Sequence, residues 1–72
     1  MSRKELWYNR ITIIWEFIKR SDEGNMNSNA YWERLVRDAN ETILQADDRV
    51  VRKAILWLLD EFERERKNAK LL

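Results

Sequence analysis

A chain of 72 residues with 44% hydrophobic and 38% charged side chains, no proline and one glycine is typical of a single domain built from amphipathic helices. The absence of histidine and cysteine removes the commonest metal ligand, the usual general base near neutral pH and any disulfide. The net charge of +1 is too small for the electrostatic footprint of a general nucleic-acid binder, so only a local basic patch would support that function.

The first helix is expected over residues 3–20. Ser2 and Glu5 have the spacing of a capping box, in which each side chain satisfies a free backbone N–H at the start of a helix. Turn-forming residues follow Arg20, and Gly24 among them can adopt the left-handed conformation that ends a helix without a Cβ clash. The first break in the chain is therefore expected between residues 20 and 28.

Segment 3–20 carries two apolar stripes, about 100° apart on the helix surface. The first stripe contains Trp7, Ile11, Ile14, Trp15 and Ile18, with Tyr8 at its margin. We predict that this stripe faces the core, because large aromatic side chains are needed to stabilise so small a domain. The second stripe contains Leu6, Arg10, Ile13, Phe17 and Arg20.

The second stripe has two interpretations. Its positions alternate four and three residues apart, as in a helix–helix seam, and arginine is common at interfaces. It is either a second wall of the monomer's own core, contacting the next helix, or a contact surface for a second chain. Because one helix of a minimal three-helix bundle hides only part of its circumference, we predict the contact surface. The predicted partner-binding residues are Leu6, Arg10, Ile13, Phe17 and Arg20.

Two further helices are expected over about 28–45 and 48–69. Asn27 or Ser28 is a suitable N-cap for the first, and Asp47 and Asp48 alone mark the boundary between the two. The apolar face of segment 28–45 contains Trp32, Leu35, Val36, Ala39, Ile43 and Ala46, and that of segment 48–69 contains Val50, Val51, Ala54, Ile55, Trp57, Leu58, Leu59 and Phe62. The predicted fold class is all-α, a compact three-helix bundle forming one domain over residues 1–72.

A local basic patch provides the alternative function. Arg49, Arg52 and Lys53 share the outer face of segment 48–69 near its start, where a DNA-recognition helix carries its contacts. Asp47 and Asp48 would face phosphates beside them and would oppose that use. A small DNA- or RNA-binding protein is therefore the second hypothesis.

Membrane and catalytic functions find less support. The longest apolar run, 54–59, has six residues, whereas a membrane span needs roughly 20, and no signal-peptide pattern is present, so a cytoplasmic protein is expected. The aromatics of segment 3–20, with Arg3, Lys4 and Lys19 nearby, would suit a membrane surface, but they are assigned to the core. The carboxylates of Asp60, Glu61, Glu63 and Glu65 are spread around a helix, so no acid–base pair, metal site or cofactor site is predicted.

Most of the chain is covered by the segments LWYNRITIIWEFIKR, YWERLVRDAN and ILWLLDEFERERK. Their arrangement resembles small uncharacterised helical proteins encoded by bacterial prophages and other mobile elements. The matching positions are Leu6, Trp7, Trp15, Lys19, Tyr31, Trp32, Leu35, Glu61 and Glu63. The resemblance implies a setting and no catalytic residue. We therefore expect a non-enzymatic accessory or regulatory protein that binds a protein partner or associates with itself.

Overall fold

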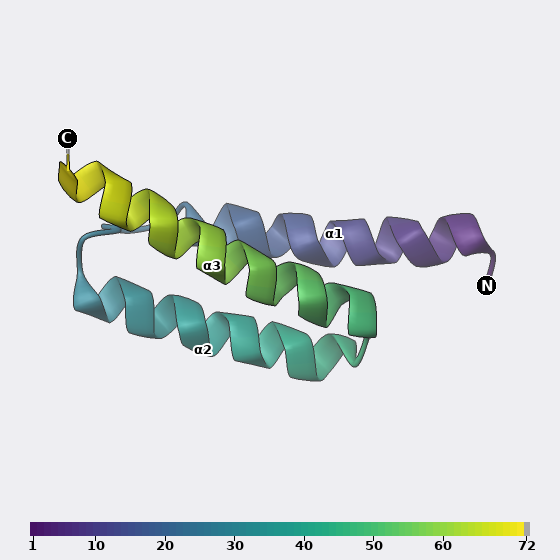
Figure 1. Ribbon diagram of the computed structural model, residues 1–72. Coiled ribbons are helices and arrows are strands. Elements are labelled where there is room, and N and C mark those ends of the chain that lie inside the picture. The colour runs from purple at the N-terminus through teal and green to yellow at the C-terminus, as the bar shows by residue number, and fades with distance from the viewer. Residues whose placement is uncertain (72) are drawn as a thin grey trace.

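Three helices make up the fold, and each contacts the other two (Figure 1). They are α1 (Arg3–Ser21), α2 (Asn29–Ala46) and α3 (Arg49–Leu71), each within two residues of its predicted bounds. The computed structural model describes the backbone of residues 1–71 and the side chains of residues 1–68. The all-α three-helix bundle predicted from the sequence is confirmed.

Each helix begins at a side chain that accepts hydrogen bonds from free backbone N–H groups. The Oγ atoms of Ser2 and Ser28 accept from the third residue after them, at 3.2 Å for α1 and 3.4 Å for α2. At the start of α3, Asp48 Oδ1 accepts from the amides of Val50 and Val51, at 2.8 and 3.0 Å. Ser2 is the predicted N-cap of α1, and Ser28 and Asp48 are each one of the two residues that the sequence offered. The caps fix where the helices start.

The two connections depend on residues with positive φ. Gly24 has φ +99°, and a Cβ there would lie 3.2 Å from the Tyr31 ring and 3.1 Å from the Arg34 guanidinium. Asp47, the last residue before the α3 cap, has φ 46° in the left-handed region. The separation of α2 from α3, which the sequence marked only with two aspartates, is therefore a tight two-residue turn.

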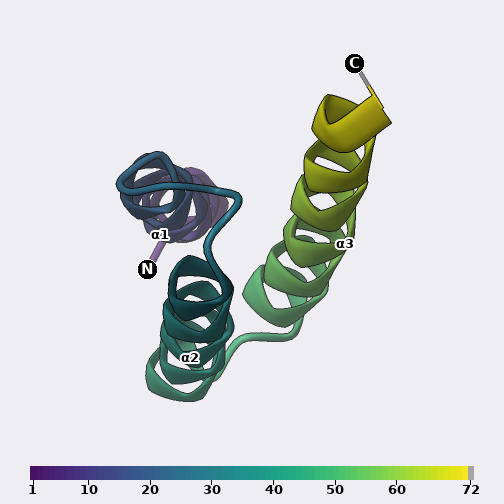
Figure 2. The same cartoon turned by 90° about the vertical axis from the view of Figure 1, so that its left-hand side faces the viewer.

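The three helices lie at the corners of a triangle, and the core fills the space between them (Figure 2). Its buried apolar residues are Phe17, Tyr31, Leu35, Ala39, Val51, Ile55 and Leu58. The rings of Phe17 and Phe62 stack across it, with their centroids 6.2 Å apart. The α2 positions predicted to face inward are buried or half-buried, and so are those of α3 with one exception, Trp57.

The predicted orientation of α1 is only partly right. Ile14 and Ile18 of the predicted core stripe pack against the buried cluster, but the aromatic residues of that stripe do not. Phe17, expected on an outer contact stripe, is fully buried, whereas Trp15, expected in the core, is 54% exposed. Trp7 and Ile11 are exposed as well. Both stripes are apolar, so hydrophobicity alone cannot choose between them. In the observed orientation Arg10 and Arg20, which lie on the Phe17 stripe, also pair with carboxylates on the other elements of the bundle.

The first two turns of α1 extend beyond the other helices. Arg10 contacts Asp48, which immediately precedes α3, so residues 3–9 lie past the start of that helix. Figure 1 shows this overhang at the N-terminal end, and it contributes to the elongated shape of 46 × 20 × 18 Å. One side of α1 therefore has neighbours only along part of its length.

Candidate functional site

The apolar residues predicted to bind a partner lie in or beside the core. Phe17 is fully buried, Ile13 packs against the buried cluster and Leu6 is half-buried. These three residues therefore form a second wall of the monomer's own core, which is the other interpretation of this stripe. The prediction that Phe17 presents an exposed contact surface is therefore wrong.

Arg10 joins α1 to the start of α3. Its Nε donates to Asp48 Oδ2 at 3.0 Å, and its guanidinium lies 4.7 Å from the centroid of the Trp7 ring. The hydrogen bond from the Val51 amide, followed by that from Arg10, holds the pKa of Asp48 below its ordinary value. Arg10 therefore stabilises a helix cap in the folded chain, a structural role that the sequence did not indicate.

Arg20 joins α1 to α2 through a two-pronged contact. Its Nε and Nη2 donate to the two carboxylate oxygens of Asp38 at 2.7 and 2.9 Å, and Nη2 also donates to Thr42 Oγ1 at 3.0 Å. The hydrogen bond with Asp38 raises the pKa of Arg20, so the guanidinium stays charged. Both arginines of the predicted binding stripe thus make contacts within the monomer.

A different set of large apolar side chains lies exposed on α1. Trp7, Ile11 and Trp15 follow one another at four-residue spacing and form one row, with Tyr8 beside it. Their exposed fractions are 39% for Trp7, 61% for Ile11, 54% for Trp15 and 70% for Tyr8. Since isolated exposed apolar residues are ordinary but a continuous row is not, this row is the candidate binding surface.

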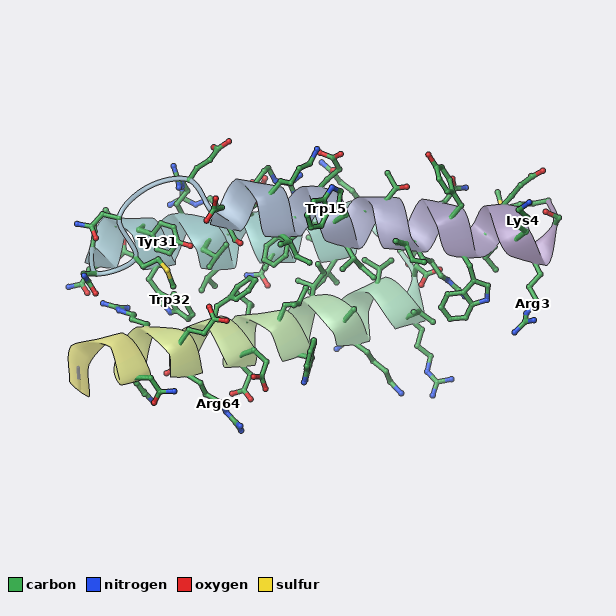
Figure 3. All side chains as sticks on the ribbon, turned by 90° about the horizontal axis from the view of Figure 1, so that it is seen from above. Arg3, Lys4, Trp15, Tyr31, Trp32 and Arg64 are labelled. Carbon is green, nitrogen blue, oxygen red and sulfur yellow. The ribbon has the colours of Figure 1, made fainter. Side chains whose placement is uncertain are left out.

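Trp57 of α3, which is 62% exposed, lies on the same side of the molecule. Trp15 of α1 and Glu65 of α3 line one groove of about 340 Å³ between the two helices. Trp57 precedes Glu65 by eight residues, so it points about 80° farther from the core on the side of α3 that faces α1. Figure 3 shows α1 and α3 side by side with Trp15 in front of the α1 ribbon. We name Trp7, Tyr8, Ile11, Trp15 and Trp57 the aromatic face.

Sequence reasoning identified the members of the aromatic face but misplaced them. It assigned all the tryptophans of α1 and α3 to the core, because large aromatic residues are usually buried. A usable signal was the charge pattern. The Phe17 stripe contains two arginines, and Asp38 and Asp48 lie at positions where a bundle could pair with them. An apolar stripe without such pairs is the better candidate for an outer face.

The basic residues of the alternative hypothesis lie at the start of α3. Arg49, Arg52 and Lys53 are exposed, as expected. Arg49 and Arg52 line a shallow cavity together with Asp47 and Asp48, whose carboxylates repel phosphate. The free amides at the start of α3 already donate to Asp48, so they are not available to an anion. No contact here favours a nucleic-acid interface over a solvated basic surface.

Other chemical features belong to the fold. The Tyr31 hydroxyl donates to the backbone carbonyl of Ser21, and burial raises the pKa of that tyrosine. Over the described residues, no group of three or more acidic side chains is placed to hold a metal ion. None of the helices in that part of the chain is long and apolar enough to cross a membrane.

Comparisons of the chain with protein-family models, curated proteins and solved structures found no match. The function must therefore be inferred from the geometry of this chain. Among the described residues, the aromatic face contains most of the large exposed apolar side chains, and none of its members belongs to the buried core cluster.

Proposed function

We propose that this protein is a non-enzymatic binding module that engages a protein through the aromatic face. One observation carries the proposal: five large apolar side chains of α1 and α3, each at least 39% exposed, lie outside the core. Their helical spacing turns them toward one side of the molecule. Tryptophan and tyrosine are the residues most enriched at the energetic centres of protein interfaces. A partner that covers this face would remove their apolar surface from water.

The energetics favour binding through α1. Burying a large apolar side chain contributes roughly 1.5–3 kcal/mol, so covering even part of the face outweighs the modest contribution of any exposed ion pair. The residues of the face sit on helices, whose backbones are already ordered, so little conformational entropy is lost on binding. A preformed surface of this kind suits an accessory or regulatory protein, and a prophage or other mobile element is the setting we propose for it.

The proposal is tested with two exposed positions of the face and one matched position elsewhere. Ile11→Gln combined with Trp15→Gln removes the centre of the α1 row. Leu44→Gln is the control, because Leu44 of α2 is 78% exposed but is not part of the aromatic face. We expect both variants to keep the helical circular dichroism spectrum, and only the double variant to lose association with untagged copies or with other captured proteins.

Two results would contradict the proposal. In the first, the double variant retains every association of the natural sequence, so the face is not the binding surface. In the second, Leu44→Gln abolishes association as strongly as the double variant does, which places the surface on α2 instead. If the double variant loses its helical spectrum, Tyr8→Gln takes its place in the test, because Tyr8 is the most exposed residue of the face.

A further inference from the structure

We infer that the occupant of the aromatic face is a second copy of this chain, packed antiparallel about a two-fold axis, an inference that rests on the proposed function. In this arrangement α1 lies against α1 of the second copy, and α3 lies against α3. A two-fold contact uses the same patch twice, so the charges around the patch must complement themselves when one copy is inverted. Both helices of the face meet this requirement.

On α3 the charges are symmetric about Trp57. Lys53 precedes it by four residues and Glu61 follows it by four, so all three share one row of the helix. When α3 is inverted about Trp57, Lys53 of each copy opposes Glu61 of the other. Lys53 is exposed. The Glu61 side chain is 38% exposed and lies 4.0 Å from Arg64, at the outer limit of an ion pair, so its carboxylate remains accessible to a second chain.

On α1 the same symmetry holds about the midpoint of Ile11 and Trp15. Lys4 lies seven residues before Ile11, and Asp22, the C-cap of α1, lies seven residues after Trp15. Inversion about this midpoint places Ile11 against Trp15 of the second copy and Lys4 against Asp22. Both charged residues are exposed.

The two centres of symmetry lie at the same level of the bundle. Arg10 contacts Asp48, and Phe17 stacks on Phe62. Trp57 lies between Asp48 and Phe62 in the chain, so it lies beside the segment of α1 between residues 10 and 17. One two-fold axis can therefore pass through both centres at once.

Neighbouring charges on this side are already neutralised within the monomer. Lys19 pairs with Glu16 at 3.0 Å. Arg64 pairs with Asp60 at 3.4 Å and, at the longer distance of 4.0 Å, with Glu61. The face is therefore basic at the end of Lys4 and Lys53 and acidic at the end of Asp22, Glu61 and Glu65. A parallel arrangement would oppose like charges. The acidic end also disfavours an anionic membrane, which a uniformly basic face would attract.

The size of the face suits a dimer. The molecule is 46 Å long and 20 Å across, so one side of it, with the aromatic face at its centre, can supply the roughly 800 Å² per partner that is standard for a stable complex. An aromatic centre with a charged rim is also the usual composition of such an interface. Three of the four tryptophans of the chain would become buried.

The test is a charge exchange followed by sedimentation equilibrium on the full chain. Lys53→Glu and Glu61→Lys each replace two attractive contacts of the dimer by two repulsive ones, so each variant alone should self-associate about tenfold more weakly. An equimolar mixture of the two variants forms heterodimers in which both contacts are attractive again. We expect the mixture to associate within about threefold of the natural sequence.

A second pair, Lys4→Glu with Asp22→Lys, repeats the exchange on α1. Arg37→Glu mixed with Glu41→Lys is the control, because both positions are exposed on α2 and carry the same changes in net charge. A mixture of the face variants that associates no better than either variant alone overturns the antiparallel dimer. The antiparallel dimer is also overturned if the two α2 variants weaken self-association singly and restore it on mixing to the same extent as the face variants. The attraction would then be nonspecific.

Two further outcomes overturn the second copy as occupant. In the first, the natural sequence remains monomeric at millimolar concentration. The proposed function still holds in that case if the Ile11/Trp15 double variant loses the capture of a different protein. It fails together with the dimer if the double variant loses nothing. In the second, the chain stays monomeric but cosediments with vesicles of phosphatidylserine and phosphatidylcholine through Trp15 and Trp57. That result would make the aromatic face a lipid-binding surface.

Discussion

Phe17 of α1 stacks on Phe62 of α3, with ring centroids 6.2 Å apart, while Trp15 of the same helix is more than half exposed. Phe17→Ala should therefore cost about 3–5 kcal/mol, comparable to the whole stability expected of so small a domain. Trp15→Ala should lower the thermal midpoint by only a few degrees. Thermal melting followed by circular dichroism compares the two, and a larger loss for Trp15→Ala would restore the orientation of α1 predicted from the sequence.

The contact of Arg20 with Asp38 should contribute measurably to the docking of α1 on α2. Its geometry is bidentate, but the Arg20 side chain is 42% exposed, so solvent screens the attraction. A double-mutant cycle with Arg20→Ala and Asp38→Ala should give a coupling energy of about 0.5–1 kcal/mol. Urea unfolding of the four proteins provides the measurement. Additive effects would show that the two side chains act independently in solution.

The cap at Asp48 predicts how stability depends on pH. Its pKa in the folded chain is lowered from the ordinary value of 3.8, so folding favours the ionised carboxylate. The stabilisation is fully present above that value and is lost as the pH falls through the lower folded pKa. In Asp48→Asn the side chain can still cap α3 but does not titrate there. Between pH 5 and 2, the natural sequence should therefore lose more stability than this variant, and parallel curves would contradict the cap.

The turn between α2 and α3 should be improvable. Asp47 has φ 46°, a conformation that glycine adopts without steric cost. Asp47→Gly should therefore raise the free energy of unfolding by up to about 1 kcal/mol, whereas Asp47→Val should lower it. Denaturant titration of both variants gives the comparison. A stabilising valine would mean that the turn in solution has a different backbone conformation.

Local signals were enough to predict the elements of this fold. Ser2, Ser28 and Asp48 are capping residues read directly from the sequence, and Gly24 and Asp47 have the positive φ values that the breaks require. Capping and turn preferences depend on a few neighbouring residues, so they need no knowledge of tertiary contacts. The helix bounds followed from them, whereas the all-α class followed from the composition and the helical spacing of the apolar residues.

The rotation of α1 could not be predicted in the same way. Its apolar residues cover both the Phe17 stripe and the Trp15 row, so the helical pattern alone leaves two core faces possible. The observed rotation brings together residues that are distant in sequence, such as Phe17 with Phe62 and Arg10 with Asp48. Because the candidate site is the face that the core does not use, an error in the core became an error in the site.

Site-specific photo-crosslinking tests the location of the binding surface whatever the partner is. A benzoylphenylalanine is placed at Tyr8, at Trp57 or, as the control, at Leu44 of α2, and intact cells that produce the protein are irradiated. We expect crosslinked products from Tyr8 and Trp57, which lie on the aromatic face of α1 and α3, and none from Leu44, although Leu44 is the most exposed of the three. Products from Leu44 with none from Tyr8 or Trp57 would contradict the assignment of the aromatic face.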